Sequence, residues 1–138
     1  MLSAFSQINW LAVLAATVAH FVLGGVWFGV LFAKPYARAL GIEDRPPSKP
    51  GPIFLLGPLL CGAVIIVTTA FLLRALGITE YGNALALGAL VGVGYLGAMV
   101  VNIAINPLFP RPLAYAIVNV PMFVIGSLMS SAILVALS

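Results

Sequence analysis

The chain has 138 residues, of which 63% are hydrophobic and 7% are charged, and its mean hydropathy is +1.21. A soluble domain carries roughly 25% charged residues, so this composition excludes a water-soluble globule and indicates an integral membrane protein. The net charge of +3 does not indicate nucleic-acid binding, because the basic residues cluster near the ends of the apolar segments. In that position they orient a membrane protein.

Four apolar segments predict four membrane-spanning helices, which fill the chain as one domain, 1–138. A helix needs about 20 apolar residues to cross the hydrocarbon of a bilayer. We therefore predict an all-α polytopic bundle of four transmembrane helices. Because the links 77–82 and 106–112 are short, we expect the spans to form two tight hairpins. The four spans are about 8–33, 53–76, 83–105 and 113–137.

The connection 34–52 is the one hydrophilic stretch of the chain. Its first half, residues 35–40, is expected to form one or two helical turns at the membrane interface. Four prolines should keep its second half from being helical, because proline lacks an N–H donor and clashes with the preceding turn. These prolines are Pro46, Pro47, Pro50 and Pro52.

The distribution of lysine and arginine predicts the orientation of the chain. Connections one–two and three–four must share a side of the membrane, and they hold five basic residues against Arg74 alone on the other side. The positive-inside rule then places both connections in the cytoplasm and both termini outside.

The segment MLSAFSQ has no basic leader and no small-residue cleavage site follows it, so we expect the first span to be retained.

Two short segments of the chain are similar in sequence. Residues 31–40 read LFAKPYARAL and residues 108–117 read LFPRPLAYAI, which are identical at five of ten positions. Both follow an odd-numbered span. A duplicated two-span hairpin with parallel repeats would give this pattern, and so would two unrelated basic turns at the same boundary.

Several motifs together resemble a known family. They are the opening INWLAVLAA, the stretch LGGVWFGVLFAKPYARALG, and the run N-x-x-x-N-x-L-F-x-R-P before the last apolar segment. The chain resembles, over nearly its whole length, the bacterial family catalogued as domain of unknown function 1761. The resemblance implies a small four-span membrane protein and no particular activity. We expect it in a bacterial cytoplasmic (inner) membrane.

His20 is an ionisable residue in the middle of the first span. Such residues are costly in a bilayer and usually mark a site or a helix contact. At about 100° per residue, Thr17 and Gly24 share the face of His20. In the other spans, the residues at the same distance from the cytoplasmic end as His20 lie next to polar side chains. His20 is therefore predicted to share a polar layer at mid-membrane with Thr68 or Thr69, Tyr95 and Ser127.

His20 has three interpretations. A neutral imidazole would donate one hydrogen bond and fix the packing of the helices. A side chain with a reference pKa near 6.5 would instead handle a proton or a substrate. Ligation of a metal or haem would need His20 from two subunits, because one chain has no cluster of ligands. We therefore predict no metal site within the chain.

A second polar group is expected on the cytoplasmic side of the membrane. Asn102 and Asn106, at i and i+4, would share one helix face, and Asn119 of the last span would lie at similar depth. These asparagines would form hydrogen bonds between helices. Alternatively they would line a vestibule beside Lys34 and Arg111 that admits a small or anionic solute.

Two glycine pairs have the spacing of close helix contacts. They are Gly25 with Gly29 and Gly88 with Gly92. Glycine at i and i+4 lets two helix backbones approach, so these pairs predict packing within the bundle or between copies of the chain.

The predicted function is that of a non-catalytic structural or accessory membrane protein without a cofactor. The only carboxylates are Glu43, Asp44 and Glu80, all in connections, so no pattern indicates an enzyme. Besides the lipid bilayer, we expect a second copy or another membrane protein as partner. The alternative is a small channel or transporter for a small solute or proton, with a path along His20 and the asparagines. Proton-coupled transporters usually carry an intramembrane carboxylate, which disfavours that alternative.

Overall fold

The computed structural model describes residues 3–46 and 48–138, so the expectation for Pro47 lies outside the described residues. Within those ranges the chain is helical and has no β-strand, which confirms the predicted all-α fold. Four helices are long and apolar enough to cross a membrane, as predicted. They comprise Trp10–Leu31, Ile53–Ala75, Tyr81–Ala104 and Pro112–Ala136.

The first and third of these helices contain a π-helical segment, in which each turn is wider than an α-helical turn. The first consists of α2 (Trp10–Val26) and η1 (Trp27–Leu31). The third consists of α5 (Tyr81–Ala89), η2 (Leu90–Gly97) and α6 (Ala98–Ala104). The second and fourth are α4 (Ile53–Ala75) and α7 (Pro112–Ala136), and two short helices, α1 (Ser3–Ser6) and α3 (Ala33–Leu40), lie outside the spans.

The helix ends follow from local sequence signals. The side chain of Asn9 caps α2 by accepting hydrogen bonds from the backbone N–H groups of Leu11 and Ala12. α7 begins with Pro112, whose fixed φ suits the first helical turn. α3 ends at Gly41, which has φ +66°, a conformation that glycine adopts without steric cost.

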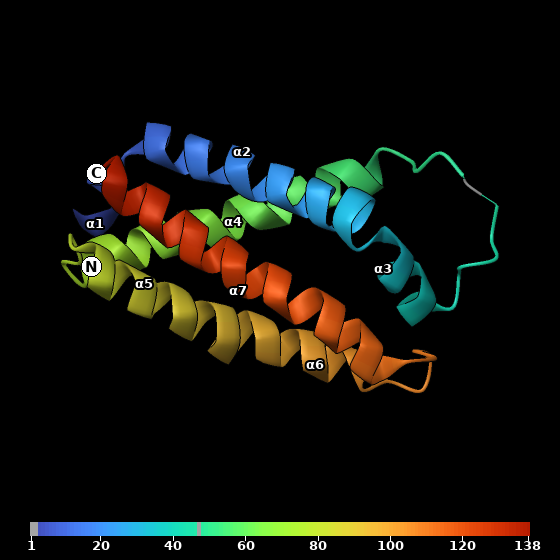
Figure 1. Ribbon diagram of the computed structural model, residues 1–138. Helices are drawn as coiled ribbons and strands as arrows, with labels where there is room; N and C mark the ends of the chain where they lie inside the picture. The colour runs from blue at the N-terminus through green and yellow to red at the C-terminus, as the bar shows by residue number, and fades with distance from the viewer. Residues whose placement is uncertain (1–2, 47) are drawn as a thin grey trace.

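α7 is the central helix of the bundle and packs against α2, α3, α5, η2 and α6. α4 packs mainly against α2 and touches α7 only in part. The first span therefore contacts both the second and the fourth, and the third contacts mainly the fourth. α4 and α5, which the link 77–82 joins, make few contacts with one another. In Figure 1 both termini lie at one end of the bundle and α3 lies at the other.

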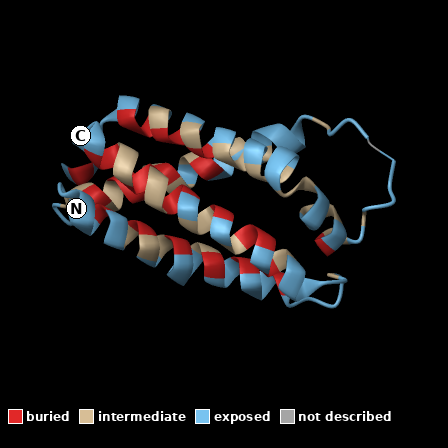
Figure 2. Ribbon diagram, in the orientation of Figure 1, coloured by how far each residue is buried: buried red, intermediate tan, exposed pale blue. Residues whose placement is uncertain are grey.

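The tightly packed core occupies the half of the bundle nearest the termini, where Figure 2 shows buried positions on facing helices. Small side chains such as Ala12, Ala16 and Ala84 let the helices approach closely around Ile66, which is fully buried. The buried residues of α4 all lie between Gly62 and Leu73, and none lies in Ile53–Cys61. α4 therefore leaves the bundle in its first half.

Candidate functional site

The departure of α4 opens a cavity of about 760 Å³ between α2, α4, α6 and α7, in the half of the bundle nearest α3. This volume lies within the range of sites that hold small molecules. Its rim includes Phe21, Phe54 and Leu55, which are exposed, so the cavity is open on the side of α2 and α4.

Small residues on two helices make room for the cavity. Gly24, Gly25 and Gly29 line it from the first span, and Gly62 lines it from α4. A Cβ added to Gly25 or Gly29 would meet no atom within 4 Å. Pro58, which lies inside α4, also faces the cavity. The missing side chains leave a space that the neighbouring helices do not fill.

His20 lies at the end of the cavity nearest the packed core. The side chain is 7% exposed and lies between two glycines, Gly62 of α4 and Gly126 of α7. Its Nδ1 atom is enclosed and has no hydrogen-bond partner in the described part of the chain. Enclosing a polar atom without a well-formed hydrogen bond costs free energy, so the helices leave Nδ1 of His20 poorly satisfied.

The walls of the cavity are mainly apolar and aromatic. Phe28 and Tyr36 have ring centroids 4.7 Å apart, and those of Tyr36 and Tyr115 are 6.1 Å apart, which forms an aromatic wall near α3. Burial raises the pKa of Tyr36, and the nearby Tyr115 raises it further, so the phenol of Tyr36 is neutral at physiological pH. The described cavity lining includes no Lys, Arg, Asp or Glu.

Contacts outside the spans hold α3 against the turn before α7. Arg111 Nη1 donates to the backbone oxygen of Arg38 at 2.7 Å and to Glu43 Oε1 at 3.1 Å. A Cβ on Gly41 would lie 3.1 Å from the ring of Pro110. Hydrogen bonds from its own backbone N–H and from Arg111 lower the pKa of Glu43.

The residues of the predicted mid-membrane layer do not form hydrogen bonds with His20. Thr17 and Thr69 are buried and each donates to a backbone oxygen one turn earlier in its own helix. Thr68 is exposed and does the same. Tyr95 is 75% exposed and lies away from the layer, whereas Ser127 is buried beside Gly126 without a partner.

The predicted asparagine cluster is not assembled. α6 ends at Ala104, so Asn106 lies in a turn, where its side chain accepts a hydrogen bond from the N–H of Leu108. Asn102 and Asn106 therefore do not share a helix face, and both are exposed. Asn119 is buried, lines the cavity and donates to the backbone oxygen of Tyr115. Lys34 is exposed, and Arg111 makes the contacts to α3 described above.

The two glycine pairs have different surroundings. A Cβ on Gly88 would lie 2.9 Å from Ser131 Oγ, and one on Gly92 would lie 2.9 Å from the Cα of Val124, so both glycines lie in the contact between the third span and α7. Gly25 and Gly29 have open space instead and line the cavity. Within one chain they do not pack against another helix, and contact between copies stays a prediction.

Several cavity residues carried no signal in the sequence analysis. Cys61, Met122 and Phe123 line the cavity, and each is an apolar residue that hydropathy alone would assign to lipid or core. Only the divergence of α4 places them around one space. Among residues 3–46 and 48–138, no three His, Cys, Asp or Glu side chains lie close enough to hold a metal ion.

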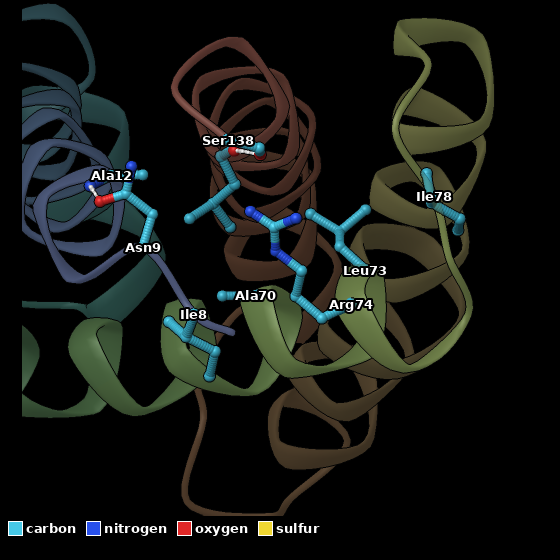
Figure 3. A pocket seen from close by; sticks show the side chains of 9 residues that line it. Ile8, Asn9, Ala12, Ala70, Leu73, Arg74, Ile78 and Ser138 are labelled. Carbon is cyan, nitrogen blue, oxygen red and sulfur yellow. Dashed lines mark hydrogen bonds between the residues drawn. The ribbon is translucent and has the colours of Figure 1, made fainter. Parts of the chain in front are cut away.

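A second, much smaller cavity of about 10 Å³ lies at the opposite end of the bundle, where Figure 3 shows Asn9, Arg74 and Ser138 around it. This space is about that of one water molecule. Asn9 donates there to the backbone oxygen of Leu137, which joins the start of α2 to the end of α7. This hydrogen bond therefore links the first and last spans at the end of the molecule opposite the large cavity.

Comparison with known proteins places the chain in a family but gives no activity. No curated protein and no solved structure matches it. The family described as "Protein of unknown function (DUF1761)" matches residues 11–135, which covers all but the first residue of the first span and the last residue of the fourth. The protein is therefore a multi-pass membrane protein that belongs to the DUF1761 family.

Proposed function

We propose that this protein is a non-catalytic accessory membrane protein that binds one small apolar or amphiphilic molecule. The observation that carries the proposal is the cavity of about 760 Å³ with His20 at its inner end. The mainly apolar lining suits a molecule that reaches the protein through the lipid, and the exposed rim at α2 and α4 provides an entry from the membrane.

The packing of the other half of the bundle supports a binding site over a continuous path. Between the cavity and the terminal end lies the core cluster that includes Ala12, Ala16, Ile66 and Leu134. A solute that entered from the α3 end would meet this packed region next to His20. The exposed positions of Asn102 and Asn106 also leave the postulated path without two of its polar residues.

The positions of the carboxylates support a non-catalytic role. Glu43, Asp44 and Glu80 all lie outside the spans, so no carboxylate of the described spans lies beside His20 to act as its acid–base partner.

The cytoplasmic membrane, with the termini outside, is part of the proposal because five of six basic residues lie at the α3 end. Association with a second copy or a larger membrane protein remains part of it as well.

The proposal is tested by the molecules that co-purify with the protein. We expect the wild type, extracted in mild detergent, to retain an apolar molecule near one per chain in native mass spectrometry and in organic extracts. Gly25→Leu should lower that content several-fold, because the new side chain occupies the cavity. Gly57→Leu is the matched control, since a Cβ on Gly57 also meets no atom within 4 Å but this residue does not line the cavity. Equal content in all three proteins would contradict the proposal.

A further inference from the structure

We infer that the molecule in the cavity is a neutral ring compound with a carbonyl or hydroxyl group, a lipid-soluble quinone being the simplest example, and that this group hydrogen-bonds to His20. The inference rests on the proposed function and names the ligand class. Three features of the cavity carry it: an imidazole at one end, aromatic walls, and a lining without full charges.

The polar end is the imidazole of His20. The position of a Cβ on Gly126 lies 2.8 Å from Nδ1 and 3.7 Å from Nε2, so Nε2 is the ring nitrogen farther from α7. Nδ1 is enclosed against α7, so Nε2 is the nitrogen that a molecule in the cavity can reach. A neutral imidazole has one donor and one acceptor nitrogen. A ligand with a carbonyl or hydroxyl at this end supplies a partner for Nε2.

The walls favour a flat ring. Phe21 and Phe28 line the cavity from the first span, Tyr115 and Phe123 from α7, and Tyr36 from α3. Aromatic side chains prefer stacked or edge-to-face contacts with other rings, which gives them an affinity for a ring beyond its apolar area. Met122, which also lines the cavity, adds a polarizable thioether that contacts rings favourably.

The absence of charge in the described lining favours a neutral ligand. A carboxylate or phosphate next to His20 would be buried in apolar surroundings without a cation, which is costly. The basic residues at this end, such as Lys34 and Arg38, lie on exposed parts of α3 and not in the lining. An acyl chain would satisfy the apolar walls but would leave His20 without a partner, so a ring with one polar group fits better.

The binding of a quinone probe is measured by quenching of tryptophan fluorescence in nanodiscs of phosphatidylcholine. The chain has two tryptophans, and Trp10→Phe leaves Trp27, which precedes the lining residue Phe28 and donates to the backbone oxygen of Val118 at 3.0 Å. Titration with a naphthoquinone that carries one isoprene unit should give saturable quenching. In this background Gly25→Leu should abolish saturation and Gly57→Leu should leave it unchanged.

Variants at His20 test the hydrogen bond. His20→Leu should weaken binding roughly fivefold to tenfold, the usual effect of one lost hydrogen bond, and His20→Gln should stay close to wild type. If His20→Leu does not fold, as judged by circular dichroism and gel filtration, His20→Ala takes its place and should show the same loss, and unchanged binding would contradict the hydrogen bond.

Quenching that rises linearly with the probe and is the same in every variant would overturn the inference, because it would report partition into lipid alone. If an acyl lipid co-purifies with the wild type, is lost in Gly25→Leu and excludes the quinone, the ligand class is wrong although the cavity binds. If no molecule co-purifies and the quinone does not saturate, both the ligand class and the proposed function are wrong.

Discussion

His20 of α2 and Gly126 of α7 fit together so closely that a Cβ at residue 126 would lie 2.7 Å from His20 Cε1. On the other side of the ring, a Cβ at Gly62 would lie 3.4 Å from Cδ2. The imidazole therefore lies between two helices at positions where neither has a side chain. This arrangement sets both the closed end of the cavity and the contact between the first and last spans.

Gly126→Ala should destabilise the protein by about 1–3 kcal/mol, because the added methyl group overpacks a ring that has little room to move. The measurement is reversible unfolding in mixed detergent micelles. His20→Ala removes the ring, so the double variant should lose much less stability than the sum of the two single changes. Additive losses would show that the two residues do not share this contact.

Gly92→Ala should also destabilise the bundle by about 1–3 kcal/mol, because the new Cβ would meet the backbone of Val124, which cannot rotate away. Gly94→Ala lies in the same π-helical segment, where a Cβ meets no atom within 4 Å, and should change stability by less than about 1 kcal/mol. Unfolding of the two variants side by side measures the difference. Equal effects would contradict the described contact between η2 and α7.

The hydropathy of the sequence predicts the spans well because membrane insertion depends mainly on the apolar content of about 20 residues. The predicted fourth span, 113–137, differs from Pro112–Ala136 by one residue at each end. The buried stripe of α2 was also predictable, since α2 is a regular α-helix from Trp10 to Val26 and periodicity holds along it. Thr17 and His20 are both buried, as members of that stripe.

The directions of Tyr95 and Asn102 could not be read from the sequence. Both follow the start of η2, whose wider turns change the angle between successive side chains. The sequence contains no pattern that predicts a π-helix at this position. The cavity was equally unpredictable, because it depends on how far α4 diverges from α7. The hydropathy of Phe54 and of Cys61 does not depend on whether the residue faces lipid or a cavity. Only the packing of the helices in three dimensions determines which of the two it faces.

Acidification should release the contact between α3 and the turn before α7. The pKa of Glu43 is lowered in the folded chain, so its contribution to stability is present above the ordinary value of 4.5 and is lost as the pH falls through the lowered pKa. Spin labels at Arg45→Cys and Leu108→Cys, in a Cys61→Ser background, should show a narrow distance distribution at pH 7 and a broad one near pH 3. Glu43→Gln should be broad at both values. A distribution that stays narrow in Glu43→Gln would show that this carboxylate does not hold α3.

The proposed orientation predicts which end of the bundle is accessible from outside the cell. In a Cys61→Ser background, a membrane-impermeant maleimide added to intact cells should label Thr79→Cys, which lies in the link between α4 and α5. Lys49→Cys should react only after the cells are lysed. External labelling of Lys49→Cys would reverse the orientation, and labelling of both residues would indicate a mixed topology.

The most direct test of the central claim is to locate an apolar ligand on the chain in native membranes. A lipid-soluble quinone that carries a photoreactive diazirine is added, irradiated and mapped by mass spectrometry of the digested protein. Binding in the cavity predicts that the modified residues concentrate at Phe28, Cys61 and Phe123, that excess unlabelled quinone removes them, and that Gly25→Leu abolishes them. Modification spread over outward-facing residues such as Leu60, Val64 and Tyr95, unchanged by competitor, would contradict the account.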